Sequence, residues 1–343
     1  DDIDEVAANA LIDIRPQIII NARPSITGKY PAKGAYKILQ AGIPILYEVG
    51  DDIFNEVREG SLLNVRGEEV YSGNRKVAEG RLLTLEDVSR KWKEANENIK
   101  DELEHFVENT LEYAKKEKDI LLGNLEVPPL KTPILGRHVL IVVRGSSYKE
   151  DLRTISSYIQ EENPVLIGVD GGADALLEFG LKPDIIVGDM DSVSDEALLC
   201  GAEIVVHAYS NGNAPGLKRV EEMGLTAQTC PMPGTSEDVA MILAWEYGAS
   251  LLVAVGTHSN MIDFLEKGRK GMGSTFLVRM KVGSILVDAR GVSQLYKQHL
   301  PTKYLLQLLA AAMVPIITVL MVSPATQPFF RILSLQLKLL FSM

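Results

Sequence analysis

The stretch Asp184-Ile-Ile-Val-Gly-Asp-Met-Asp-Ser192 decides the fold. Its apolar half predicts a short buried strand, and its acidic half begins directly behind Gly188. Short runs rich in Val and Ile recur along the chain at His138–Val143, Val165–Val169, Glu203–Val206 and Leu251–Val255. Helical stretches such as Ala173–Phe179 and Val239–Tyr247 separate these runs. The alternation predicts an α/β fold with a mostly parallel sheet that is covered by helices on both faces.

The ends of two predicted strands carry acidic residues. Ligands of such sheets bind at the carboxyl ends of the strands. Asp189 and Asp191 lie two residues apart in a chain that we expect to be extended, so both carboxylates would face one Mg²⁺. Asp170 ends another strand, and Gly171 and Gly172 behind it would let a ligand approach the backbone closely. The alternative is that these acids only form solvated turns.

A helix start adds further polar groups to the predicted edge. Thr235 and Asp238 form a capping box at the start of the helix from Val239. The free N–H groups of a helix start, with the hydroxyls of Thr235 and Ser236, also suit a phosphate. Capping alone would need no ligand.

Two more strand ends complete the set. Gly256-Thr257-His258 follows strand 251–255, where His258 could contact a phosphate or cap the next helix. Arg144-Gly145 follows the first strand of the domain and adds a cation.

A long uncharged segment lies near the end of the printed sequence. No charged residue occurs between Lys303 and Arg331. This pattern predicts a transmembrane helix over residues 304–323, kinked at Pro315. No hydrophobic signal segment opens the sequence, so with this single anchor near its end we expect a single-pass membrane protein with a cytoplasmic body. The apolar tail, 324–343, would lie in the membrane interface or pack on a partner.

Three segments precede the large domain of residues 137–290. Residues 1–83 predict a small α/β domain, and 123–136 a stiff linker. Residues 84–122 contain no Pro or Gly and begin with a capping box. Apolar positions from Val88 to Ile120 recur at steps of three and four. They indicate either a coiled coil in a homodimer or a long helix lying on its own domain.

The composition excludes some classes of protein. The chain has 343 residues, is 46% hydrophobic and carries a formal net charge of −11. So acidic a chain is a poor general binder of nucleic acid, and so apolar a chain is not disordered throughout. Its two cysteines, Cys200 and Cys230, fit a reducing compartment and two buried side chains.

The acidic motifs carry a family resemblance. Asp170-Gly-Gly-Ala-Asp174, followed by Lys182-Pro183-Asp184 and the run to Ser192, resembles thiamine pyrophosphokinases. The resemblance implies bound ATP and Mg²⁺, with Asp189 and Asp191 as metal-binding catalytic acids. It also matches Ser236–Asp238 loosely to a later T-D motif, which makes Asp238 a third catalytic candidate. The family's G-G-R-x-D-H motif is replaced here by Gly256–Asn260, which lacks the Arg and the Asp.

The order of segments resembles a second family. An amino domain with Asn21–Pro31, a long helix, Gly136–Gly145, a pyrophosphokinase-like domain and a final apolar span resemble the SteA family of cytokinetic-ring, or septation, proteins. This resemblance implies a role in cell division and cell separation, at the septum, through membrane or cell-division protein partners. The amino domain also resembles the swivelling phosphohistidine domain of phosphoenolpyruvate-using enzymes, but Lys33 stands where that family has its phospho-accepting His.

Two functions therefore remain open at this point. The first is a membrane-anchored division protein whose pyrophosphokinase-like domain binds a nucleotide or phosphate ligand and scaffolds partners. The alternative is an active Mg²⁺-dependent pyrophosphokinase that transfers diphosphate from ATP to a hydroxyl acceptor. The sequence alone does not decide whether the chain is an enzyme.

Overall fold

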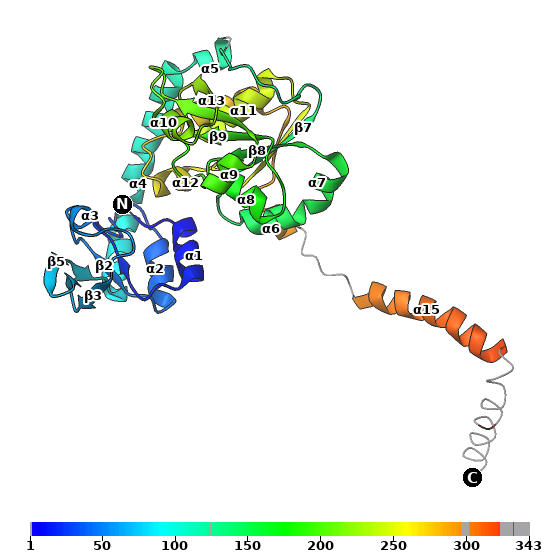
Figure 1. Ribbon diagram of the computed structural model, residues 1–343, viewed down its shortest axis with the longest axis horizontal. Coiled ribbons are helices and arrows are strands. Elements are labelled where there is room, and N and C mark those ends of the chain that lie inside the picture. The colour runs from blue at the N-terminus through cyan, green and yellow to red at the C-terminus, as the bar shows by residue number, and fades with distance from the viewer. Residues whose placement is uncertain (1, 124, 296–301, 323–331, 333–343) are drawn as a thin grey trace. The chain divides into compact units, whose positions relative to one another are not determined.

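The computed structural model describes residues 2–123, 125–295, 302–322 and 332 (Figure 1). The chain divides into two units, Asp1–Ser293 and Gln294–Met343, and each is described by itself.

A seven-stranded sheet forms the centre of the first unit. Its order is β11-β10-β9-β8-β7-β12-β13, and every neighbouring pair is parallel. The strands are β7 (His138–Val142), β8 (Val165–Val169), β9 (Ile185–Gly188), β10 (Glu203–Ala208), β11 (Ala227–Pro231), β12 (Leu251–Val255) and β13 (Leu286–Asp288). This confirms the predicted α/β fold with a parallel sheet.

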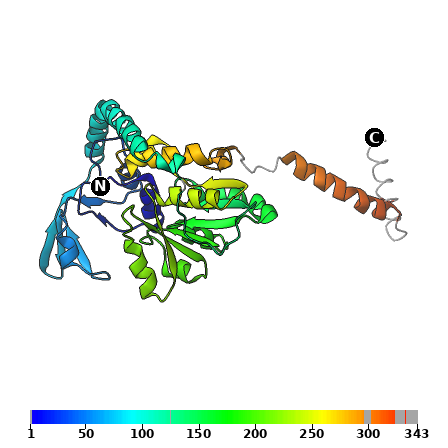
Figure 2. The same cartoon turned by 90° about the horizontal axis from the view of Figure 1, so that it is seen from above.

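Helices cover both faces of this sheet (Figures 1 and 2). Alternate residues of a strand point to opposite faces. Val139 and Ile141 of β7 accordingly pack in one buried cluster with α11 and α13, while Leu140 and Val142 pack in another with α6, α7 and α8. The helices of the domain are α6 (Tyr148–Thr154), α7 (Ser156–Glu162), α8 (Gly172–Glu178), α9 (Asp195–Leu199), α10 (Pro215–Glu222), α11 (Ser236–Glu246), α12 (Met261–Glu266), α13 (Gly273–Val282) and α14 (Val292–Leu295).

The amino-terminal part of the same unit has its own small core. It contains α1 (Glu5–Ile14), α2 (Gly34–Gln40), α3 (Ile53–Glu56) and two three-stranded sheets. One sheet joins β1 (Ile19–Ile20), β2 (Ile45–Tyr47) and β6 (Arg81–Leu82), and the other joins β3 (Leu63–Arg66), β4 (Glu69–Ser72) and β5 (Arg75–Glu79). Ile38 and Ile45 are completely buried between these elements.

A long helix, α4 (Leu85–Lys116), follows and is continued by the short α5 (Asp119–Leu122). The side chains of Thr84 and Asp87 form the predicted capping box. Val88 and Trp92 pack in the amino-terminal core, and the Trp92 indole N–H donates to the Ala32 carbonyl oxygen at 2.7 Å. Farther along, α4 contacts α13 of the large domain (Figure 1). Val88, Ala95, Phe106 and Ile120 of the seam are buried within the chain, which favours the helix-on-its-own-domain interpretation over the coiled coil.

The predicted transmembrane helix over residues 304–323 is not confirmed. Residues of this segment form α15 (Thr302–Val322), which contains Pro315. A spanning helix needs about 20 consecutive apolar residues to cross roughly 30 Å of hydrocarbon. None of the helices in the described ranges is long and apolar enough to cross a membrane.

The predictions that depended on this helix are corrected with it. The membrane-spanning element of the fold, the membrane as a partner through that helix, and the single-pass localisation at the cell membrane are wrong. The predicted tail, 324–343, lies outside the described residues except for residue 332.

Candidate functional site

The strand order reverses between β7 and β12, which makes this the switch point of the sheet. Ligands of parallel sheets bind in the crevice at such a point. The loops that follow these two strands touch through their backbones: a Cβ on Gly145 would lie 1.8 Å from the carbonyl oxygen of Gly256. Gly256 also has a φ of +69°. Only glycine lets the two loops come this close.

A cavity of about 350 Å³ opens at this edge of the sheet. It brings together eight of the residues predicted from sequence, namely Arg144, Asp170, Gly171, Asp189, Ser192, Thr235, Ser236 and His258. The other predicted residues are not part of its lining, namely Gly145, Gly172, Asp191, Asp238, Gly256 and Thr257. Residues from strand ends far apart in the sequence thus share one cavity.

Asp170 and Asp189 form the acidic side of the cavity. The backbone N–H of Asp189 donates to Asp170 Oδ1 at 3.0 Å. Gly188 makes room for this contact, because a Cβ there would lie 1.7 Å from the same oxygen. Burial and the negative charge of Asp189 raise the pKa of Asp170 to about 7. A divalent cation between the two carboxylates would offset that repulsion.

Asp191 lies differently from the prediction. Met190, between the two acids, has a φ of 67°, in the left-handed region. The chain is therefore not extended there, and the rule that alternate residues face the same side does not apply. Asp191 is exposed, and its backbone N–H donates to Asp189 Oδ1 at 3.1 Å. The structure thus pairs Asp189 with Asp170 inside the cavity.

The two carboxylates suit a cation that takes most of its ligands from water and substrate rather than from the protein. Across the described residues, no group of three or more His, Cys, Asp or Glu side chains could hold a metal ion. Mg²⁺ commonly uses only one or two carboxylates and completes its shell with water and substrate phosphates. Asp170 and Asp189 fit that pattern.

The start of α11 forms another wall. Asp238 Oδ2 accepts from the Thr235 backbone N–H at 2.9 Å and from the Thr275 hydroxyl at 2.8 Å. Asp238 is completely buried, and its Oδ1 has no hydrogen-bond partner among the described residues. Burial raises its pKa to about 6 despite these bonds. Asp238 therefore holds the start of α11 in place through these hydrogen bonds, while Thr235 and Ser236 line the cavity.

His258 is held by Glu237, the next residue of the same helix start. The Glu237 carboxylate accepts from the His258 backbone N–H at 2.9 Å and also contacts the imidazole Nδ1. The helix after His258 is capped by Asn260, whose side chain accepts from the Asp263 N–H at 3.1 Å. Capping, one of the two roles considered for His258, thus belongs to Asn260, and the imidazole is positioned at the cavity wall.

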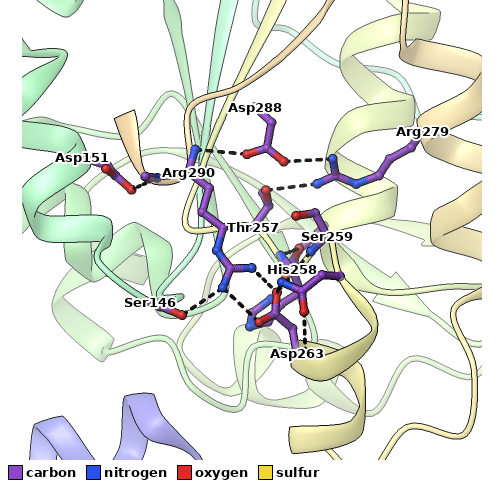
Figure 3. A network of polar contacts seen from close by, with 12 residues as sticks. Ser146, Asp151, Thr257, His258, Ser259, Asp263, Arg279, Asp288 and Arg290 are labelled. Atoms are coloured by element: carbon purple, nitrogen blue, oxygen red, sulfur yellow. Dashed lines mark hydrogen bonds and ion pairs between the residues drawn. The ribbon is translucent and has the colours of Figure 1, made fainter. Parts of the chain in front are cut away.

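A polar network joins the loops behind the cavity (Figure 3). The Arg290 guanidinium forms a two-pronged ion pair with Asp263 and donates to Ser146 Oγ at 3.2 Å. It thereby connects the loop after β13, the start of α12 and the loop after β7 (Figure 3). Next to it, Arg279 donates to Asp288 at 3.0 Å and to the Thr257 hydroxyl at 3.2 Å.

Sequence reasoning missed several residues of the lining, namely Val143, Val169, Glu237, Asp263, Phe264, Lys267 and Arg269. Lys267 and Arg269 matter most, because they add two positive charges to a cavity that also holds Arg144. The basic run Lys267-Gly-Arg-Lys270, directly after a predicted strand and helix, was the signal that could have found them.

Two family models match parts of the chain. One, described as "Thiamin pyrophosphokinase, catalytic domain", matches residues 157–208, which include Asp170 and Asp189. The other, described as "SteA-like C-terminal domain", matches residues 290–341. The matches support the thiamine pyrophosphokinase-like fold.

Three archaeal proteins are similar in sequence, and all are named 6-hydroxymethyl-7,8-dihydropterin pyrophosphokinase. The protein of Pyrococcus furiosus is 30% identical over 179 residues, which cover 48% of this chain and 75% of that protein. The protein of Methanocaldococcus jannaschii is 32% identical over 120 residues, which cover 34% of this chain and 49% of that protein. The protein of Methanothermobacter thermautotrophicus is 32% identical over 148 residues, which cover 39% of this chain and 62% of that protein.

The solved structures that match include two thiamine pyrophosphokinases. The thiamine pyrophosphokinase of Bacillus subtilis gives a TM-score of 0.28 at 23% identity, covering 44% of this chain and 61% of that one. The enzyme of Geobacillus thermodenitrificans gives a TM-score of 0.27 at 21% identity, covering 45% and 60%.

Proposed function

The chain belongs to the same family as the 6-hydroxymethyl-7,8-dihydropterin pyrophosphokinase of Pyrococcus furiosus, and on this premise we propose that it is a Mg²⁺-dependent pyrophosphokinase. It would transfer the diphosphate group of ATP to the hydroxyl group of an acceptor. The relatives support this alternative better than the division role. They also make 6-hydroxymethyl-7,8-dihydropterin the first acceptor to try.

The observation that carries the proposal is the charge arrangement of the switch-point cavity. Two of its carboxylates, Asp170 and Asp189, share it with the basic side chains of Arg144, Lys267 and Arg269. The other two carboxylates of the lining, Glu237 and Asp263, are bound to His258 and Arg290, and Arg144 is paired with Glu178. A triphosphate needs both kinds of group: cations that neutralise its oxygens and carboxylates that hold Mg²⁺. Backbone N–H groups at the start of α11 would add an uncharged phosphate contact.

The proposed transfer is a displacement at the β-phosphorus of ATP. The acceptor hydroxyl oxygen forms a bond to the β-phosphorus of ATP, and the bond from that phosphorus to the bridging oxygen breaks. AMP leaves with the bridging oxygen, and the hydroxyl proton passes to solvent. Bound Mg²⁺ would supply charge neutralisation of the phosphates. The chain's own contribution is positioning and electrostatic stabilisation, which dominate phosphoryl transfer.

The division role rests on the match of residues 290–341 to a SteA-like domain. None of the three pyrophosphokinase relatives supports a role in septation. It is a second candidate, and it becomes the main one only if the chain shows no transfer activity.

Release of AMP tests the proposal. The full chain is incubated with ATP, Mg²⁺ and either the dihydropterin alcohol or thiamine, and AMP is followed by chromatography. Asp189→Asn should reduce acceptor-dependent AMP release by at least a hundredfold, because it removes one metal-binding charge. Glu196→Gln, an exposed acid on the nearby α9, is the matched control and should leave the rate unchanged. AMP release that does not depend on either acceptor would contradict the proposal.

A further inference from the structure

A second cavity, of about 720 Å³, lies beside the first within the same unit. Its walls come from the amino-terminal part through Thr27 and Tyr30, from α4 through Phe106, and from the segment Leu265–Lys270 after α12. Lys267 and Arg269 line both cavities. The two spaces therefore share one wall, and that wall carries positive charge.

The Tyr30 hydroxyl is a polar group of this cavity that lacks a hydrogen-bond partner among the described residues. Tyr30 is only 5% exposed, and its hydroxyl is buried without a hydrogen bond to any described residue. Buried polar groups nearly always have a partner, and an unsatisfied one costs about 1–3 kcal/mol. Burial and nearby acids, Glu266 first among them, raise the pKa of Tyr30, so the hydroxyl keeps its proton and can donate it to a ligand.

Glu266 is an acidic residue of the same lining, and its negative charge acts on the Tyr30 hydroxyl. Burial, and the negative charges of Glu5 and Asp4, raise the pKa of its carboxyl group. A ligand that donates N–H groups would satisfy this carboxylate.

The charges around the cavity favour a neutral polar ligand over an ion. The lining contains both basic side chains, such as Lys29 and Lys270, and acidic ones, such as Asp4 and Glu102. A free anion or cation would meet repulsion from one set. The volume lies within the range of small-molecule sites, and Phe106 offers an apolar surface to a flat ring.

We propose that this second cavity binds the acceptor of the transfer, a flat nitrogen heterocycle that carries a primary alcohol. Glu266 accepts hydrogen bonds from the ring N–H groups, and the Tyr30 hydroxyl donates to a ring nitrogen or carbonyl oxygen. The alcohol points to the shared wall, where Lys267 and Arg269 meet the diphosphate. The amino-terminal part of the chain thus completes the acceptor site. The inference rests on the proposed function.

Calorimetry with the full chain tests it. The probe is 6-hydroxymethyl-7,8-dihydropterin, added in the presence of Mg²⁺ and α,β-methylene ATP, which cannot be cleaved at the reacting bond. Glu266→Gln should weaken binding of the dihydropterin about tenfold and Tyr30→Phe about fivefold, the sizes of one charged and one neutral hydrogen bond. The affinity for the nucleotide should change less than about twofold. Matched controls are Tyr209→Phe and Glu108→Gln, both exposed and outside the cavity.

A blocking variant guards against a folding artefact. Lys29 is exposed and lines the cavity, so Lys29→Trp should fill it without disturbing the core. It should abolish binding of the dihydropterin while the melting temperature stays that of the wild type. Unchanged affinity for the dihydropterin in all three variants would overturn the inference, and so would a wild-type chain that binds the nucleotide but not the dihydropterin. A wild type that binds no nucleotide at all would instead overturn the proposed function.

Discussion

Replacing Arg290 by Gln should destabilise the loops that form the candidate nucleotide site. The Arg290 guanidinium connects three loops through its contacts with Asp263 and Ser146 (Figure 3). Glutamine is shorter and uncharged, so it cannot form the two-pronged ion pair. Asp263 would then keep its negative charge at a largely buried position, with hydrogen bonds only from the Ser259 backbone N–H and the Asn260 side-chain amide among the described residues.

The size of the effect follows from the burial of the pair. Removing one partner of a buried ion pair costs about 3–5 kcal/mol. The side chains of Arg290 and Asp263 are 24% and 10% exposed, so solvent screening reduces the expected loss of unfolding free energy to roughly 2 kcal/mol. The affinity for a nucleotide should also fall, because Asp263 lines the cavity.

The loss should depend on pH with a definite sign. Burial alone would raise the pKa of Asp263, but the hydrogen bond and charge of Arg290 outweigh it and hold this pKa below its usual value. A lowered folded-state pKa gives stabilisation that is complete above the unfolded pKa and is lost as pH falls through the folded one. The free energy of unfolding of the wild type should therefore exceed that of Arg290→Gln most at pH 7, and the difference should vanish below about pH 4.

Urea unfolding of the full chain at pH 7 and pH 3 measures both quantities. A double-mutant cycle with Asp263→Asn isolates the coupling between the two side chains. Arg23→Gln, which breaks the exposed pair with Asp51, is the control and should have no measurable effect. An equal loss at both pH values, or a coupling near zero, would refute the assignment of the ion pair as the connecting element.

Three further changes test other parts of the structure. Gly188→Ala would place a Cβ 1.7 Å from Asp170 Oδ1, so Mg²⁺-dependent nucleotide binding measured by calorimetry should be lost, and retained binding would contradict the site geometry. Asp238→Asn removes a carboxyl group whose pKa in the folded state is raised to about 6. This group ionises at lower pH in the unfolded state, so the wild type loses stability as pH rises from 4 to 7 and the variant does not. The melting temperature of the variant should therefore rise relative to that of the wild type over this range, and parallel curves would count against this. Trp92→Phe loses the hydrogen bond to the Ala32 carbonyl and should cost about 1 kcal/mol in urea unfolding, whereas no loss would indicate that α4 is not held there.

The predicted site residues illustrate how far local patterns reach. Asp170 and Asp189 were found because each follows an apolar run and so lies at a strand end. The start of α11 was found because Thr235 and Asp238 form a capping box. Asp191 was placed beside Asp189 on the assumption of an extended chain. The left-handed φ of Met190 turns it away, and no pattern of residue types announces that turn.

The long helix shows a similar limit. Its capping box could be read directly, because the two residues involved lie three positions apart. The seam along α4 could be recognised as apolar, but not what covers it. In the structure it is covered by the chain's own amino-terminal core and by α13.

The sequence by itself determined the parallel α/β class, the positions of the main strands and the acidic and glycine-rich strand ends, since these follow from propensities and contacts within a few residues. Only the tertiary structure decided the strand order, the switch point between β7 and β12, and the ion pair of Arg290 with Asp263. It also decided that Lys267 and Arg269 after α12 line two cavities at once and that the amino-terminal part lines the second one. Such contacts join residues far apart in the chain, and they form only when packing of the buried faces brings those residues together.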